Sequence, residues 1–276
     1  MAENSTPSVD DTSSPQRAML RSEPRLRMKG IGKSFGAVRA LSGVDFEVYD
    51  GEVVGLVGDN GAGKSTLIKT ISGVGPADEG EMFVQGQPVK ITNPNAATRL
   101  GIQTVYQDLA LCDNLDVVAN LFLGREELAP LRGLKENDME KQGLRVLKTL
   151  DVKLPSIRAV VAQLSGGQRQ SIAVAKSILR NASIVLLDEP TAALGVAQTR
   201  QVLQLIRRLR DQGLAVVVIS HNLADVFEVV DRVIVLRLGK RVGTYVVKDT
   251  TPEQVVAAIT GAEFGQLLEA NGNGGH

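Results

Sequence analysis

Short apolar runs recur along the chain and predict strands that are buried on both faces. They occupy residues 52–57, 184–187 and 214–219, and each contains almost no polar position. Uninterrupted runs of this kind are typical of parallel strands covered by helices on both sides. Two further runs, 233–238 and 241–247, are separated by Gly239-Lys240, which predicts a hairpin.

Helical spacing of apolar residues alternates with these runs. From Lys64 to Ser72 the apolar residues recur every three to four positions, and Gly73 is a suitable C-cap. A mixed stretch, 108–162, has helical periodicity around 138–150 and no obvious strand, so it resembles a helical insertion. We therefore expect an α/β domain over 25–265 between a disordered tail at 1–24 and a flexible tail at 266–276.

Composition narrows the class of protein. The chain has 276 residues, 43% of them apolar, and its 31 basic and 31 acidic side chains balance. Balanced charge argues against nucleic acid as a partner. The single cysteine, Cys112, and the two histidines, His221 and His276, exclude a disulfide and a Cys/His metal cluster. The purest apolar run is far shorter than the roughly 20 residues that cross a bilayer, and no signal peptide is recognisable, so we expect a soluble intracellular protein.

A glycine-rich loop follows the first buried strand and fits the pattern G-x-x-x-x-G-K-[ST]. Glycines let the backbone wrap a phosphate, and the N–H groups at the following helix start face the anion. Lys64 would bind the outer phosphates of ATP, and the Ser65 hydroxyl would ligate Mg²⁺. The alternative is a plain turn with a surface lysine. The predicted nucleotide-binding residues here are Gly58, Asp59, Asn60, Gly61, Ala62, Gly63, Lys64, Ser65 and Thr66.

Two carboxylates end the buried strand at 184–187. Residues just past the carboxyl end of a parallel strand reach the ligand crevice. Asp188 is then placed to hold Mg²⁺, and Glu189 to orient a water for attack on the γ-phosphate, which predicts hydrolysis. The alternative is a solvated acidic turn before Pro190.

A second helix start carries anion-binding features. Ser165-Gly166-Gly167-Gln168 precedes a segment with apolar residues at helical spacing. Ser165 is also an ordinary N-cap residue, but two glycines at a helix entrance expose N–H groups to an anion. Either both helix starts bind one ATP within a monomer or each ATP is shared between two chains, and the spacing does not decide.

These motifs, in this order, resemble the ATP-binding cassette superfamily over residues 25–262. The resemblance implies a P-loop NTPase fold with a mostly parallel core sheet, an antiparallel β portion and a helical subdomain at about 108–178. It also implies an ATPase that uses ATP and Mg²⁺, as a head-to-tail homodimer in which Ser165, Gly166 and Gly167 of one chain close on the other chain's ATP.

Three shorter sequence segments are similar to those of bacterial ribose/galactose/fructose-type sugar importers, and most similar to those of the single-cassette fructose type. The segments that carry this resemblance are 105–111, 120–126 and 190–195. They imply transmembrane permease subunits as partners, a sugar-binding protein outside the membrane, and a peripheral position on the cytoplasmic face of the bacterial inner membrane. The sugar would be fructose or a related monosaccharide, with ribose, xylose or a polyol open.

The resemblance also assigns three more site residues. Gln107 matches the glutamine that senses Mg²⁺ and the membrane subunit, His221 the histidine that contacts the γ-phosphate, and Phe35 the aromatic position that stacks on adenine. Each has a plainer alternative: a polar strand-exit residue, a structural histidine and a packing aromatic. Gly195 departs from the family, because many cassettes have an aspartate there, so coupling between the two ATP sites is in doubt.

Two other functions compete with a transport motor. A cassette ATPase acting on DNA or ribosomes would carry a long coiled-coil insertion or a second cassette, and the chain has neither. A small-molecule kinase would share the phosphate loop but is disfavoured by Glu189 and by the second helix start. Co-purification with a membrane protein would favour the motor, and stimulation by nucleic acid the second function.

Overall fold

The computed structural model describes residues 23–129 and 133–262. The predicted tails at 1–24 and 266–276 lie outside this part, apart from residues 23 and 24. The strands are β1 (Leu26–Phe35), β2 (Val38–Val48), β3 (Glu52–Val57), β4 (Glu79–Val84), β5 (Gln87–Val89), β6 (Ile102–Val105), β7 (Ile184–Asp188), β8 (Ala215–Ile219), β9 (Arg232–Arg237) and β10 (Lys240–Val246). The α-helices are α1 (Lys64–Ile71), α2 (Pro94–Arg99), α3 (Val117–Phe122), α4 (Glu136–Thr149), α5 (Gly166–Leu179), α6 (Val196–Asp211), α7 (Leu223–Val229) and α8 (Pro252–Thr260), with short 3-10 turns at Val161–Gln163 and Val247–Asp249.

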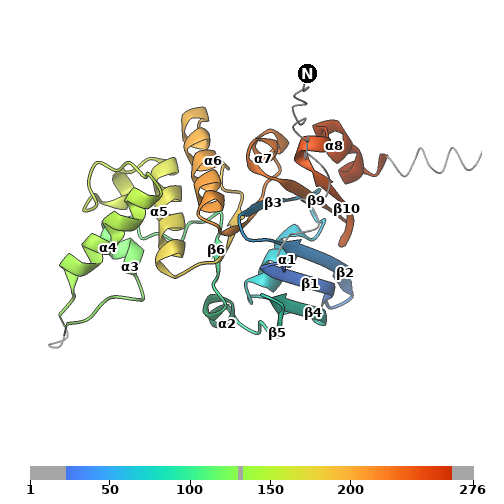
Figure 1. Cartoon of the computed structure of the whole chain (residues 1–276), viewed down its shortest axis with the longest axis horizontal. Coiled ribbons are helices and arrows are strands. Elements are labelled where there is room, and N and C mark those ends of the chain that lie inside the picture. Colours follow the sequence, from blue (N-terminus) through green and yellow to red (C-terminus); the bar gives the residue numbers. More distant parts are fainter. Residues whose placement is uncertain (1–22, 130–132, 263–276) are drawn as a thin grey trace, which may run out of the picture.

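The strands form two sheets (Figure 1). A six-stranded sheet has the order β10-β9-β3-β8-β7-β6, and all its neighbours pair in parallel except β9 and β10. A four-stranded antiparallel sheet has the order β2-β1-β4-β5. The predicted combination of a mostly parallel core with an antiparallel β portion is therefore confirmed.

Both faces of the six-stranded sheet are buried, which explains the continuous apolar runs. Along β7, Val185 and Leu187 belong to one hydrophobic cluster, while Ile184 and Leu186 belong to another on the opposite face. The first cluster includes α5 and α6, and the second includes α1 and the antiparallel sheet. Because side chains alternate along a strand, a strand between two clusters needs apolar residues at every position.

Most predicted elements lie within one or two residues of their observed positions. The expected hairpin is β9 and β10, whose turn is formed by Leu238 and Gly239 with φ values of 49° and 73°. The segment 136–149 is helical, near the predicted 138–150. The expected C-cap at Gly73 is displaced by one residue: Ser72 is the C-cap, and Gly73 follows with φ +77°.

The strands of the antiparallel sheet were not predicted individually. In β1, buried positions are interrupted by exposed Lys29 and Gly30, and its pairing with β2 shifts register three times. Those irregularities break the two-residue alternation by which a half-buried strand is recognised.

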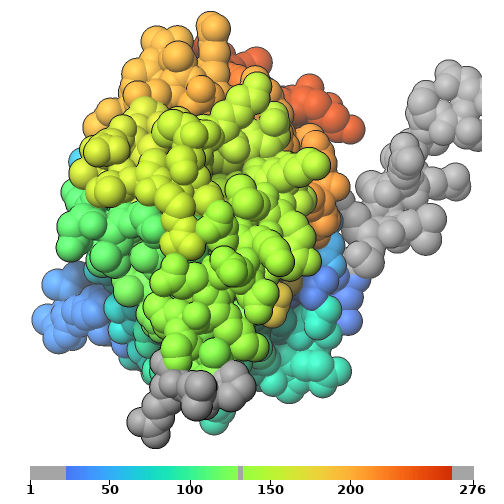
Figure 2. All heavy atoms as spheres, turned by 90° about the vertical axis from the view of Figure 1, so that its left-hand side faces the viewer, coloured from blue at the N-terminus to red at the C-terminus, as the bar shows by residue number. Residues whose placement is uncertain are grey.

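The helices α3, α4 and α5 lie together to one side of the six-stranded sheet (Figure 1). The segment that contains them, coloured green to yellow, covers much of the face shown in Figure 2. In the described part of 108–162 no strand is formed, only isolated bridges of Asp116 with Val160 and of Leu128 with Leu134. The helical character predicted for this insertion is confirmed, and its limits as a subdomain at 108–178 stay a prediction. Within 23–129 and 133–262, no helix is both long and apolar enough to cross a bilayer.

Candidate nucleotide site

The three glycines of the loop between β3 and α1 serve different purposes. All have positive φ, +152° at Gly58, +80° at Gly61 and +105° at Gly63. A Cβ on Gly58 would lie 2.2 Å from the Leu236 carbonyl oxygen, and one on Gly63 2.9 Å from the Ala40 carbonyl oxygen. A Cβ on Gly61 would meet nothing within 4 Å. Gly58 and Gly63 therefore let the loop pack against its own chain, whereas the space around Gly61 is open.

Lys64 begins α1 and closes this loop. Its Nζ donates to the carbonyl oxygens of Gly58 and Asp59, at 2.6 and 2.9 Å. Burial lowers the pKa of Lys64, and the charges of Glu189, Asp59 and Asp188 oppose that shift. The folded chain thus brings the predicted phosphate-binding lysine close to both predicted carboxylates.

No side chain caps the start of α1. Gly63, the N-cap, has no side chain to accept from the first N–H groups of the helix. Free N–H groups and the helix dipole favour an anion. Asp59, Asn60 and Ser65 are exposed, Thr66 is half-buried, and Ala62 packs into the core while its N–H donates to Asp59.

Glu189 and His221 meet beyond the carboxyl ends of β7 and β8, and Asp188 is the last residue of β7. Glu189 has the left-handed backbone conformation, φ +50°, and its N–H donates to the Ile219 carbonyl oxygen at 2.9 Å. Its Oε2 lies 2.9 Å from Nδ1 of His221. The side chain of His221 is 76% exposed, against 17% for Glu189. The histidine is therefore free to contact a ligand that arrives from solvent, which a histidine fixed in the core is not.

The donors present fit a magnesium ion. Burial raises the pKa of Asp188 and the neighbouring Glu189 raises it further, so its ionised form gains from a nearby cation. Ser65 adds an exposed hydroxyl at the first turn of α1. Mg²⁺ keeps several waters and binds through one or two carboxylates together with substrate phosphates, so one carboxylate and one hydroxyl are a sufficient protein contribution. The described residues contain no group of three or more His, Cys, Asp or Glu that holds a metal by itself.

The second predicted anion site, Ser165–Gln168, is a complete capping box. Oγ of Ser165 accepts from the N–H of Gln168 at 3.3 Å, and Oε1 of Gln168 accepts from the N–H of Ser165 at 3.0 Å. The plain N-cap interpretation is therefore confirmed, and a contact with phosphate stays a prediction. A Cβ on Gly166 would lie 2.7 Å from a methyl carbon of Leu194, and one on Gly167 3.2 Å from Cβ of Gln198. Both glycines let α5 approach the segment that follows Glu189.

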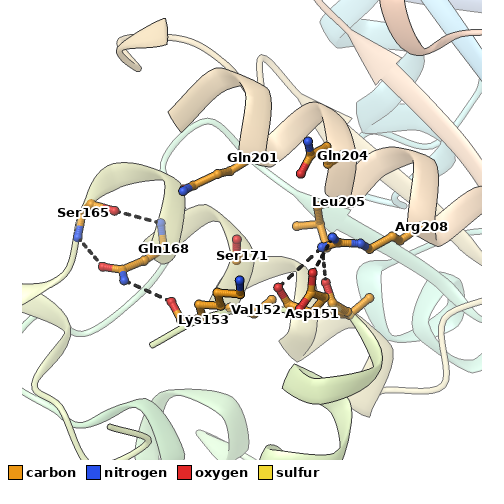
Figure 3. Close-up of a pocket in the computed structure, with 11 residues that line it drawn as sticks. Asp151, Val152, Lys153, Ser165, Gln168, Ser171, Gln201, Gln204, Leu205 and Arg208 are labelled. Carbon is orange, nitrogen blue, oxygen red and sulfur yellow. Dashed lines mark hydrogen bonds and ion pairs between the residues drawn. The ribbon is translucent and has the colours of Figure 1, made fainter. Parts of the chain in front are cut away.

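Further hydrogen bonds lie next to this helix start, around a cavity of about 220 Å³ (Figure 3). Nε2 of Gln168 donates to the Lys153 carbonyl oxygen at 3.1 Å. Arg208 of α6 donates to the Leu150 carbonyl oxygen at 2.8 Å and to the Asp151 carboxylate at 2.6 Å. Sequence reasoning missed Arg208, because it belongs to a basic run, 207–210, that has the composition of a solvated helix face.

The remaining predicted site residues are exposed. Gln107 lies in the loop after β6, and Phe35, 54% exposed, ends β1 with the Nζ of Lys33 5.6 Å from its ring centre. Phe35 is thus not a packing residue of the core, although stacking on adenine stays a prediction. Gly195, where many cassettes have aspartate, is the N-cap of α6 and provides no side chain to cap it.

The chain belongs to the ABC transporter family, whose domain matches residues 41–192. It is 45% identical over 251 residues to the fructose import ATP-binding protein FrcA of Rhizobium meliloti, covering 88% of this chain and 96% of that protein. It is 44% identical to the xylose/arabinose import ATP-binding protein XylG of Sulfolobus acidocaldarius, with the same coverage of both chains.

Solved structures agree with this assignment. An ATP-binding cassette of an ABC transporter in its ADP conformation superposes with a TM-score of 0.77 at 25% identity, covering 87% of this chain and all of that one. A dimeric ATP-binding cassette in a post-hydrolysis state, bound to ADP and Pi, has a TM-score of 0.67 at 26% identity, covering 80% of this chain and 98% of that one. The chain therefore has the fold of an ABC ATPase, as the sequence motifs predicted.

Proposed function

We propose that the chain is the ATP-hydrolysing subunit of a monosaccharide importer, and that its nucleotide-binding domain spans 25–265. The observation that carries the proposal is the pairing of Glu189 with His221 at 2.9 Å, beyond the ends of two strands and close to Lys64. A carboxylate next to a phosphate-binding lysine suits hydrolysis, since it can take the proton of an attacking water.

The residues divide the work as follows. The N–H groups at the start of α1 and the ammonium of Lys64 bind the β- and γ-phosphates, and Lys64 exchanges its bonds to Gly58 and Asp59 for phosphate oxygens. Glu189 orients the water and accepts its proton, while His221 donates to a γ-phosphate oxygen, where charge accumulates in the transition state. The ring of Phe35 stacks on the adenine.

Magnesium would be held by Ser65 and Asp188, with Gln107 beside it, and would neutralise charge between the β- and γ-phosphates. A cation there also offsets the burial of the Asp188 carboxylate, whose pKa is raised.

We infer that each ATP is shared between two chains. Leu67 and Ile68 of α1 belong to one hydrophobic cluster and Ile172 and Val174 of α5 to the other, so the two helices pack on opposite faces of the same sheet. That separation argues against both helix starts binding one nucleotide within a monomer. It favours a head-to-tail homodimer in which Ser165, Gly166, Gly167 and Gln168 of one chain face the triphosphate bound by the other. The dimeric cassette with ADP and Pi supports this arrangement.

The transported substrate is inferred from the relatives. Their names specify import of fructose and of xylose or arabinose, so the shared class is a monosaccharide, and the higher identity belongs to the fructose protein. An importer needs a route through the bilayer. We infer that transmembrane permease subunits provide it, that a sugar-binding protein outside the membrane delivers the sugar, and that this chain acts at the cytoplasmic face of the inner membrane.

The test is the substitution Glu189→Gln. An amide keeps the shape of the side chain but cannot take a proton from water, so ATP is bound and not hydrolysed. We expect ATPase activity to fall by about a hundredfold or more, and the protein to change from monomer to dimer when ATP is added, measured by light scattering. Glu228→Gln, an exposed carboxylate paired with Arg207, is the matched control and should hydrolyse ATP normally. Full activity of Glu189→Gln, or a strictly monomeric ATP complex, would contradict the proposal.

A further inference from the structure

The cavity beside the start of α5 is lined by both apolar and polar side chains (Figure 3). It lies between α6 and the segment 150–153 that follows α4. Leu150 and Leu205, 0% and 2% exposed, supply most of its apolar lining. Pockets for drug-sized ligands have about 300–1,000 Å³. At about 220 Å³, this cavity therefore fits a smaller molecule.

Hydrogen bonds within the chain hold part of the lining in place. Nη2 of Arg208 donates to the Asp151 carboxylate at 2.6 Å, and the Gln168 amide makes the backbone bonds described above. The Ser171 hydroxyl donates to the Gly167 carbonyl oxygen at 2.8 Å, which leaves its own oxygen able to accept. These bonds give the cavity a defined shape without a ligand.

Three other lining side chains, Lys153, Gln201 and Gln204, have no partner for their polar ends among the residues that the structure describes. Gln201 and Gln204 lie one turn apart on α6, across the cavity from Lys153 (Figure 3). A carboxamide both donates and accepts, as the hydroxyl groups of a carbohydrate do, whereas an ammonium group only donates and suits an anion. A solvated helix face also exposes such groups, but here two separate elements bring them to one cavity.

The charges of the lining favour a ligand with a negative charge. Asp151 neutralises Arg208 through their ion pair. Among the described residues that line the cavity, Lys153 is then the one cation without a counter-charge.

We propose that this cavity binds a small hydroxylated anion, of the class of a sugar phosphate or a sugar acid. Lys153 pairs with the phosphate or carboxylate of this ligand, and Gln201 and Gln204 hydrogen-bond to its hydroxyl groups. Leu150 and Leu205 contact its carbon skeleton. The site is separate from the predicted nucleotide loop, since none of the residues 58–66 lines it.

The position of the cavity connects such a ligand to ATP hydrolysis. Ser165 and Gln168 line the cavity, and in the proposed dimer both face the triphosphate of the other chain. A ligand that bridges α6 and 150–153 would keep Gln168 in its present bonds and so withhold it from that triphosphate. We therefore expect the ligand to inhibit. This inhibition rests on the proposed function, because it assumes a shared ATP site, whereas binding of the ligand does not.

Calorimetric titration of the full chain without ATP tests the site. The probes are fructose 6-phosphate and gluconate, with fructose as the neutral comparison and inorganic phosphate as the comparison without hydroxyl groups on carbon. We expect one of the two probes to bind more tightly than either comparison by about tenfold or more, and the tighter probe shows whether the acid group is a phosphate or a carboxylate. Equal affinity for fructose or for inorganic phosphate would overturn the proposal, as would the absence of saturable binding at millimolar concentrations.

Variants of the lining locate the bound probe. Lys153→Met should weaken binding by about tenfold, because an ion pair is lost, and Gln204→Leu by several-fold, because hydrogen bonds are lost. Both side chains are exposed, so the fold should not change. Lys141→Met, at an exposed lysine of α4 outside the cavity, is the matched control and should bind normally. Unchanged affinity of both lining variants would overturn the proposal.

The nucleotide loop is a second place where a phosphorylated probe could bind. Lys64→Ala should bind the probe as the unmodified chain does, because Lys64 does not line the cavity. Loss of binding in this variant would place the probe in the nucleotide loop and overturn the proposal.

ATPase measurements distinguish failure of this inference from failure of the proposed function. At a saturating concentration of the probe, the unmodified chain should lose about half of its activity or more, and Lys153→Met should need about tenfold more probe for the same loss. Without the probe, both should hydrolyse ATP equally fast. Binding without inhibition would overturn the regulatory role. A chain that binds the probe but hydrolyses no ATP would refute the proposed function and support the site.

Discussion

Packing within the chain requires glycine at single positions of the predicted nucleotide loop. Gly58 and Gly63 have no room for a side chain because the carbonyl oxygens of Leu236 and Ala40 approach them, whereas Gly61 faces open space. The sequence motif predicts all three glycines for a single reason, backbone access to phosphate. Only the folded chain shows the packing role of Gly58 and Gly63, because the carbonyl groups belong to segments far away in sequence.

Lys64→Ala tests the assignment of the phosphate-binding cation. The variant should lose about a hundredfold or more in ATP affinity, because a charge-assisted contact to the outer phosphates disappears. The measurement is equilibrium binding of a fluorescent ATP analogue, with circular dichroism as the check on folding. Lys90→Ala, at an exposed lysine after β5, should bind normally. Unchanged affinity of Lys64→Ala would remove this lysine from the site.

The elements that could be predicted are those with a strong local pattern. Continuous apolar runs marked the central strands, and helical spacing marked α1 and α4. The strands of the antiparallel sheet were not predicted, because β1 shifts register near Gly30 and exposes Lys29 between buried positions. The contacts of Arg208 with Leu150 and Asp151 could not be predicted either. They join α6 to a segment 57 or 58 residues earlier, and no local sequence pattern indicates them.

The N-terminus of α6 has no side chain that caps it. Gly195 is its N-cap at φ −74°, a conformation open to any residue, and a Cβ there meets nothing within 4 Å. Gly195→Asp should raise the free energy of unfolding by about 0.5–1 kcal/mol, because the carboxylate caps free N–H groups and the unfolded chain loses entropy. The midpoint of thermal unfolding should rise by about 2 °C.

Gly195→Ala separates the two causes of that gain, because alanine restricts the unfolded chain without capping the helix. Equal stabilisation by alanine and aspartate would show that the carboxylate makes no cap. A lower unfolding midpoint for the aspartate variant would contradict the assigned geometry of the N-cap.

In the molecule as a whole, the central sheet separates α1 from α5, whose starts are the two predicted phosphate-binding sites. The motifs alone left open whether one chain or two bind each ATP, because their spacing in sequence says nothing about which face a helix covers. The hydrophobic clusters carry that information, with α1 on one face and α5 on the other.

Mixing two inactive variants tests this arrangement. Lys64→Ala lacks a working phosphate loop, and Ser165→Arg blocks the start of α5. In a shared-site dimer of one chain of each kind, one of the two sites is made entirely from intact parts. We expect the mixture to recover ATPase activity that neither variant has alone, measured by phosphate release. Activity that never exceeds the sum of the separate variants would indicate that each chain binds its own nucleotide.

The position of α1 and α5 on opposite faces also has a genetic consequence. If the start of α5 in one chain completes the nucleotide site of the other, a variant chain altered there inactivates a site on the wild-type chain with which it dimerises. Alleles that alter Ser165 should then impair sugar uptake even in cells that also express the wild-type gene, whereas alleles that merely prevent folding should be recessive.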